Sequence, residues 1–137
     1  MNNLFLDAAY AIALSAVTDQ YHKKAEILAR QIETEAIQMI TTRAVILEIG
    51  NALARLRYRA NAIKLLDSIE EDPNVKIIAL SEELYNRAME LYRQRPDKEW
   101  GITDCVSFVV MQDYDITEAL TTDEHFKQAG FRPLLIE

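Results

Sequence analysis

The sequence contains little of what disulfide frameworks, long loops and membrane spans require. Its 137 residues include only three glycines and three prolines, which argues against long loops, and one cysteine. This single cysteine, Cys105, excludes a disulfide framework and fits a reducing compartment. No apolar run approaches the roughly 20 residues of a membrane-spanning helix. The first apolar run stops at Asp7 and is too short for a signal peptide, so we expect a soluble, cytoplasmic protein.

Positive charge is scarce as well, because the chain carries a net charge of −7. An acidic excess argues against tight non-specific binding to nucleic acid, which depends on lysine and arginine neutralising phosphates. If the acids gather in a metal pocket, however, a bound cation reverses the local field and this objection no longer applies. The basic residues that bear on a nucleic-acid partner form two groups: Arg55, Arg57 and Arg59, and then Arg87, Arg93, Arg95 and Lys98.

Short apolar runs alternate with helical patterns along the chain, and half of the residues are hydrophobic, which suits one domain, residues 1–137, with a real core. The patterns predict strands at residues 3–6, 37–41, 75–80, 118–121 and 132–136. They predict helices at residues 7–17, 21–35, 43–59, 60–71, 81–95, 103–114 and 123–129. This alternation predicts an α/β fold of three layers, with helices on both faces of a central, mainly parallel sheet of about five strands.

Four acidic residues stand where the apolar runs meet helices. Asp7 and Asp123 follow predicted strands, and Asp104 opens an apolar helix. The fourth, Glu48, lies inside the helix predicted over residues 43–59, beside an apolar stripe formed by Ile46, Ile49, Leu53 and Leu56. Ligands of parallel sheets bind beyond the carboxyl ends of the strands. Clustered carboxylates repel one another unless a cation joins them, so this pattern predicts a divalent metal site and, with it, phosphate chemistry.

Each acid also has a simpler explanation when it is taken alone. Asp7, Asp104 and Asp123 could each cap the helix that follows. Glu48 could occupy a solvated position at the edge of its helix. Four such residues in one small α/β chain, all able to reach one edge of the sheet, favour a shared site.

Four segments of the chain, in this order and at this spacing, match a family pattern that covers its whole length. They are residues 4–7, Thr42 with Glu48, residues 100–108 and residues 119–126. The third segment, with the run Thr-Asp-Cys-x-Ser-Phe, and the fourth, with Leu-Thr-x-Asp-x-His-Phe, are the specific ones. On these residues the chain resembles the PIN domain, in the small form found as the ribonuclease toxin of VapBC toxin–antitoxin pairs.

The resemblance implies a PIN-like fold and a metal-dependent ribonuclease that uses Mg²⁺, with Mn²⁺ as the alternative ion. By the match, the catalytic and metal-binding quartet is Asp7, Glu48, Asp104 and Asp123, with polar support from Thr42, Thr103, Ser107 and Thr121. We expect Asp7 and Asp104 to bind metal directly and Asp123 to bind it directly or through water. Glu48 would orient the attacking water or hold a second ion. The family also implies an RNA substrate, a VapB-like antitoxin partner and, commonly, a homodimer.

The four hydroxyl residues near the quartet each have two interpretations. Thr42, Thr103 and Thr121 could serve the site, or they could cap helices and strand ends. Ser107 could hydrogen-bond a site carboxylate, or it could bond the carbonyl four residues earlier in its own helix.

Three further residues are candidates for contacting RNA. Arg55 and Arg59, spaced i, i+4 on one face of a predicted helix, could bind phosphates, or they could form a solvated helix end. Trp100 lies in residues 96–101, the longest polar break between predicted elements. There it could stack on a base or pin the loop onto the core.

Other functions fit the sequence less well. A histidine ribonuclease needs two imidazoles as acid and base, but His22 falls on a predicted surface helix, and His125 suits a supporting or exposed position. A phospho-receiver domain or a haloacid-dehalogenase phosphatase needs a second acid soon after the first strand, where this chain has Ala8 and Ala9. The alternatives that remain are a PIN nuclease outside toxin systems and a catalytically silent PIN interaction module.

Overall fold

An entirely parallel sheet of five strands runs through the molecule in the order β3-β2-β1-β4-β5. The computed structural model describes residues 2–137. The strands are β1 (Leu4–Leu6), β2 (Met39–Thr42), β3 (Val75–Ile78), β4 (Glu118–Leu120) and β5 (Arg132–Pro133). The helices are α1 (Ala8–Ser15), α2 (His22–Glu35), α3 (Arg43–Ala52), α4 (Leu56–Glu71), α5 (Glu82–Gln94), α6 (Ile102–Asp113) and α7 (Glu124–Gln128), followed by a 3₁₀ turn, η1 (Leu134–Ile136).

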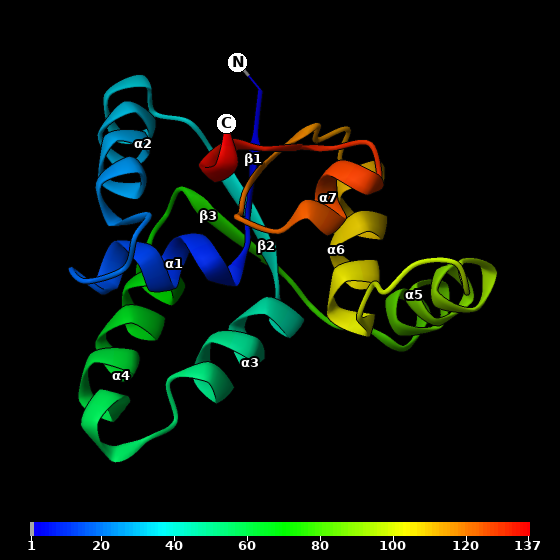
Figure 1. The fold of residues 1–137 in the computed structure, drawn as a ribbon, viewed down its shortest axis with the longest axis horizontal. Coiled ribbons are helices and arrows are strands. Elements are labelled where there is room, and N and C mark those ends of the chain that lie inside the picture. The colour runs from blue at the N-terminus through cyan, green and yellow to red at the C-terminus, as the bar shows by residue number, and fades with distance from the viewer. Residues whose placement is uncertain (1) are drawn as a thin grey trace.

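Helices cover the sheet from both sides (Figure 1). Helices α1, α2 and α4 lie on one side, and α5, α6 and α7 lie on the other. Helix α3 starts directly after β2 and packs against both α1 and α6, so it bridges the two layers at the carboxyl ends of the strands. The predicted three-layer α/β fold with a parallel sheet is therefore confirmed.

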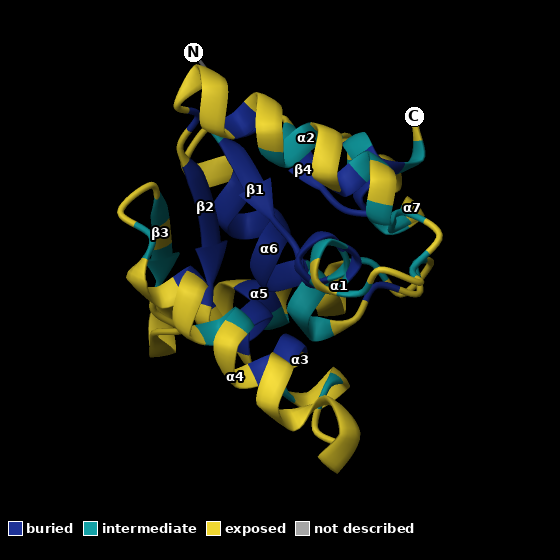
Figure 2. Cartoon of the chain, turned by 90° about the vertical axis from the view of Figure 1, so that its left-hand side faces the viewer, coloured by how far each residue is buried: buried dark blue, intermediate teal, exposed yellow. Residues whose placement is uncertain are grey.

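The sheet centre and helix α6 form the core of the fold. Every residue of β1 is buried, and so is every residue of α6 from Cys105 to Met111, as the dark blue ribbon in Figure 2 shows. The Phe108 ring packs edge-on against both Trp100 and Phe126, with ring centroids 5.0 Å apart in each pair. This cluster ties the start of α6 to α7, and both of these helices carry acids of the predicted quartet.

The long helix predicted over residues 43–59 is wrong, because the chain turns between α3 and α4. Ile46 and Ile49 are buried as the stripe predicts, but Leu56 is 93% exposed at the start of α4. The chain changes direction here because α3 packs against α6, whereas α4 packs against β3. The Arg59 guanidinium donates two hydrogen bonds to the Ala54 carbonyl, at 2.7 and 3.1 Å, and so satisfies a backbone group that the break leaves open.

The strand predicted over residues 132–136 is also mostly wrong. Strand β5 ends at Pro133, and a 3₁₀ turn replaces the rest. Proline has no N–H to offer a strand ladder, so it is confined to edge strands and strand ends. The backbone N–H of Leu135 instead donates to the Thr121 carbonyl at 3.2 Å, and the Leu135 side chain is buried over the end of β4.

The helix predicted over residues 60–71 starts four residues earlier, at Leu56. The other predicted boundaries agree with the structure to within one or two residues, the usual uncertainty of helix and strand ends. Within residues 2–137, no helix has both the length and the apolar character that crossing a bilayer demands.

Candidate metal centre

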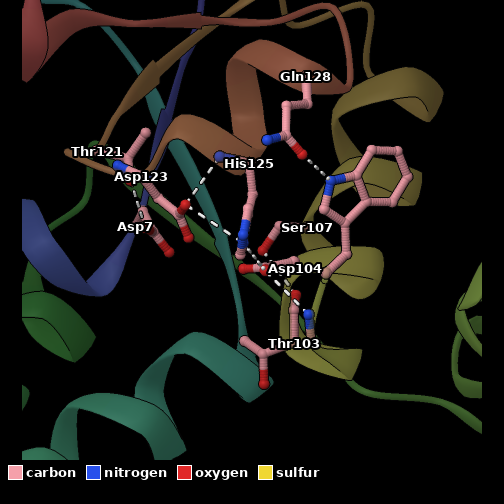
Figure 3. Close-up of polar contacts among 10 residues, drawn as sticks. Asp7, Thr103, Asp104, Ser107, Thr121, Asp123, His125 and Gln128 are labelled. Carbon is pink, nitrogen blue, oxygen red and sulfur yellow. Dashed lines mark hydrogen bonds and ion pairs between the residues drawn. The ribbon is translucent and has the colours of Figure 1, made fainter. Parts of the chain in front are cut away.

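Two neighbouring parallel strands deliver Asp7 and Asp123 to the same edge of the sheet. Leu6 pairs with Leu120 at the ends of β1 and β4, and each strand then runs directly into its acidic segment. The first turn of α6 brings Asp104 to this edge, and α3 brings Glu48. In Figure 3 the side chains of Asp7, Asp104 and Asp123 lie near one another at this edge.

Asp7 is the buried member of the group. Its side chain is only 7% exposed, and the Thr121 hydroxyl donates a hydrogen bond of 2.7 Å to its Oδ2 atom. Burial, opposed by this hydrogen bond and reinforced by the charges of Glu48 and Asp104, raises the pKa of Asp7 to about 7. Asp7 precedes α1 but makes no side-chain capping bond to it, so the capping interpretation fails for this residue.

Asp104 is held by donors on two sides. Its Oδ2 atom accepts a hydrogen bond of 3.1 Å from the Gly101 backbone N–H and lies 3.0 Å from Nδ1 of His125. Partial burial raises the pKa of Asp104, and these two donors lower it less than burial raises it. Asp104 therefore bonds the backbone at the start of its own helix, as the capping interpretation predicts, and it also lies beside Asp123 and His125. Its role as a metal ligand stays a prediction.

Asp123 serves as the cap of α7. Its Oδ1 atom accepts a hydrogen bond of 2.8 Å from the His125 backbone N–H. Its own backbone N–H donates to the Thr121 hydroxyl at 3.1 Å. Because Thr121 also donates to Asp7, a single hydroxyl connects the acids that follow β1 and β4.

Glu48 stands at the rim of the group. Its side chain is exposed, and it shares the wall of a groove of about 370 Å³ with Thr103. Loss of water around the carboxylate, together with the charges of Asp104 and Asp123, raises the pKa of Glu48. No hydrogen bond joins Glu48 to either aspartate, so only their charges act on its carboxylate.

The donor set fits a hard divalent cation. Asp104, Asp123 and His125 each offer a ligand atom, and these atoms lie within 4.8 Å of one another. Oxygen-rich sets suit Mg²⁺ and Mn²⁺, and an imidazole is also acceptable to Mn²⁺. Burial is the main cause that raises the pKa values of Asp7, Glu48 and Asp104, and neighbouring negative charge adds to it; a bound cation would favour the ionised carboxylates.

The four hydroxyl residues differ in whether they contact the acidic group or the backbone of a helix. Thr121 belongs to the site through its bond to Asp7. Thr42 caps α3 by accepting a bond of 3.2 Å from the Val45 backbone N–H. Ser107 donates to the Thr103 carbonyl at 3.1 Å, so the simpler interpretation holds for it, and Thr103 itself lies half-buried at the start of α6.

Among the RNA-contact candidates, Trp100 agrees with the second of its two interpretations, whereas the predicted shared helix face of Arg55 and Arg59 is wrong. Trp100 is 5% exposed, and its indole N–H donates to the Gln128 side chain at 3.1 Å, so the ring pins the loop before α6 and offers no free face to a base. Arg55 precedes α4 as its capping residue, so Arg55 and Arg59 do not share a helix face. Both arginines are exposed, and Arg59 is engaged with the Ala54 carbonyl.

His125 is the site residue whose contacts the sequence did not predict. Its Nδ1 atom lies 3.0 Å from Asp104 and 3.4 Å from Asp123, while its ring remains 30% exposed. The available signal was its position two residues after an acid that caps a helix. A side chain at that position points back toward the capping acid. The other residue that it contacts depends on where the start of α6 lies in the fold.

Comparisons with known proteins agree with this architecture. A sequence comparison with curated proteins found no significant match. Among solved structures, the fold is similar to that of VapC20 of Mycobacterium tuberculosis, a toxin that cleaves the sarcin–ricin loop, with a TM-score of 0.81. The two sequences are 23% identical, and the match covers 94% of this chain and 96% of VapC20. The family model of the PIN domain matches residues 4–132, so this chain belongs to the PIN domain family.

Proposed function

We propose that this protein is a metal-dependent endoribonuclease that uses Mg²⁺ or Mn²⁺. The observation that carries the proposal is the convergence of Asp104 and Asp123 with His125, whose ligand atoms lie within 4.8 Å of one another at the carboxyl edge of β1 and β4. Asp7 is linked to this group through the Thr121 hydroxyl, and Glu48 stands at the rim. Carboxylates gathered in this way are the oxygen ligands that hard divalent cations prefer. The family membership and the fold shared with an RNA-cleaving toxin make RNA the preferred substrate.

The chain's own residues divide the work of hydrolysis among them. When bound, a divalent metal lowers the pKa of water and offsets the charge of a scissile phosphate. Asp7 and Asp104 would hold the ion directly, and Asp123 would hold it directly or through water. Glu48, at the rim, would orient the attacking water or hold a second ion. The expected products carry a 5′-phosphate and a 3′-hydroxyl.

The similarity to a toxin supports proposals about partners. VapC20 is a toxin, and we propose that this chain is likewise the toxin of a VapBC pair, acting as a homodimer in the cytoplasm. Its antitoxin would cover the acidic group with a short segment and present a cation, such as an arginine, to the carboxylates. If overexpression of the chain is harmless and no short antitoxin frame adjoins its gene, a nuclease outside toxin systems takes precedence.

Cleavage of a labelled total-RNA pool tests the nuclease proposal. Wild-type protein, purified free of any bound partner, should cut RNA in Mg²⁺ or Mn²⁺ and not in EDTA. Asp104→Asn should lower the rate by on the order of 100-fold or more, because it removes a charged ligand from the metal. Asp113→Asn is a matched control, since Asp113 lies at the far end of α6 and pairs with Arg87 outside the site.

Two results would contradict the proposal. Cutting that survives EDTA would exclude a metal-dependent mechanism. An absence of cutting by the wild-type protein in every metal would favour a catalytically silent interaction module.

A further inference from the structure

We propose that His125 is a positioning residue of the metal site. Its imidazole holds Asp104 through Nδ1, and its backbone holds Asp123, so that this one residue sets the spacing of the two aspartates. The inference rests on the proposed function, because that function assigns both carboxylates to a divalent cation. It adds a residue, and a role for that residue, to the acidic quartet.

The geometry gives His125 two separate contacts with the aspartates. Its ring atom Nδ1 lies 3.0 Å from Asp104 Oδ2 and 3.4 Å from Asp123 Oδ1. Its backbone N–H donates to Asp123 Oδ1 at 2.8 Å. An ionised carboxylate can only accept, so Nδ1 carries the hydrogen that faces Asp104. The dashed lines in Figure 3 follow these contacts from one residue to both acids.

These contacts leave one oxygen of each aspartate free. Asp104 Oδ2 is occupied by the Gly101 backbone and His125, and Asp123 Oδ1 is occupied by the His125 backbone. No hydrogen bond from residues 2–137 reaches Asp104 Oδ1 or Asp123 Oδ2. Each carboxylate is thus fixed through one oxygen and can present the other to a cation. Partners that orient metal ligands in this way commonly change metal affinity by about 10–100-fold.

The position of His125 is itself rigid. The next residue, Phe126, is fully buried, and its ring packs against Phe108 of α6 and Phe5 of β1. The short helix α7 therefore cannot rotate without opening the core. A donor anchored in this way can hold two like-charged groups close together before any cation arrives, whereas without it their repulsion would favour their separation.

Binding of Mn²⁺ and Mg²⁺ to the purified full-length chain, measured by titration calorimetry, tests this role without reference to cleavage. His125→Asn places an amide N–H near the position of Nδ1 and should bind both ions within about threefold of the wild type. His125→Gln, whose amide lies one carbon further out, and His125→Ala should bind them about 10–100-fold more weakly. His22→Gln is the matched control, since the other histidine contacts the Ala13 carbonyl.

The outcomes separate this inference from the proposed function. If the wild type binds metal and His125→Ala binds it equally well, only the positioning role is overturned. If the wild type binds neither ion, the proposed function fails and this inference fails with it. Electron paramagnetic resonance of bound Mn²⁺ gives a second readout: a directly coordinated nitrogen that disappears in His125→Ala would make His125 a ligand and would also overturn the positioning role. Thermal unfolding of each variant in EDTA checks that the fold is intact.

Discussion

At the scale of single residues, specific hydrogen bonds hold the acids of the site where burial and neighbouring negative charge disfavour their ionised form. Asp7 is buried with one neutral hydroxyl as its side-chain donor, while Glu48 and Asp104 add negative charge nearby. Its pKa of about 7 means that the folded chain retains a proton that the unfolded chain loses near pH 4. The folded state therefore binds more protons between these values, and its stability falls as the pH rises from about 4 to about 7.

The variant Asp7→Asn should accordingly stabilise the metal-free protein. The gain should be on the order of 2–4 kcal/mol at pH 8, since one pKa unit corresponds to about 1.4 kcal/mol, and it should shrink as the pH falls toward 4. Urea unfolding in EDTA at pH 5 and pH 8 measures it. Asp67→Asn, a change at an exposed acid of α4, should give no comparable gain. A destabilised Asp7→Asn protein at pH 8 would contradict the strained-acid interpretation.

The sequence identified which acids would meet but not what would hold them. Asp7 and Asp123 follow apolar strands, and this position alone predicts that they share a sheet edge. The bond from Thr121 to Asp7 depends on β4 pairing directly with β1, and no local pattern specifies which strands are neighbours. The contact of His125 with Asp104 likewise requires the packing of α7 against α6, which only the three-dimensional fold provides.

At the scale of helices and strands, the apolar pattern predicted the elements wherever packing and periodicity agree. Helix α6 is apolar almost all round and is buried, as expected. The turn between α3 and α4 was not predicted, because the connecting residues 53–55 include neither glycine nor proline, Gly50 lies inside α3, and the apolar spacing continues through the turn. The last strand was predicted too long because its apolar pattern continues past Pro133, where the ladder of backbone hydrogen bonds ends.

The variant Phe108→Ala tests how far the site depends on α6. Phe108 is buried between Trp100, Phe126 and Phe131, so its loss should leave a cavity and lower the free energy of unfolding by about 3–5 kcal/mol. It should also weaken metal binding, because the cluster anchors α7 beneath Asp123. Urea unfolding and metal titration measure the two effects. Tyr114→Ala, at the exposed end of the same helix, should cost under about 1 kcal/mol and leave metal affinity unchanged.

At the scale of the whole molecule, the net charge of −7 sets a condition on any RNA complex. Several of the basic side chains are already paired with acids: Arg87 with Asp113, Arg95 with Asp97, and Arg132 with Glu118 and Glu137. The 22 acidic residues outnumber the 15 lysines and arginines, and the candidate site itself repels phosphates. A cation at the site would therefore supply attraction for an RNA backbone where the acids otherwise repel it.

Binding of RNA should consequently depend on metal. In EDTA at about 150 mM salt, the dissociation constant for a labelled RNA oligonucleotide should be about 100 μM or weaker, and Mg²⁺ should tighten it by about tenfold or more. Fluorescence anisotropy, read before cleavage and at matched ionic strength, measures this. In Mg²⁺, Asp104→Asn should bind as weakly as the wild type does in EDTA. Tight binding in EDTA with a steep salt dependence would show instead that a basic surface governs recognition.

The pairing of β1 with β4 also has a consequence for the synthesis of the protein on the ribosome. Asp7 is synthesised well before its partner Thr121, which follows 114 positions later, and Asp123 and His125 come later still. The central strand β1 lacks one of its two neighbours until β4 has emerged. A nascent or prematurely terminated chain that stops before residue 123 thus has no complete acidic group. If the protein cleaves RNA, this topology delays its activity until β4 and α7 have left the ribosome, whose RNA the activity could damage.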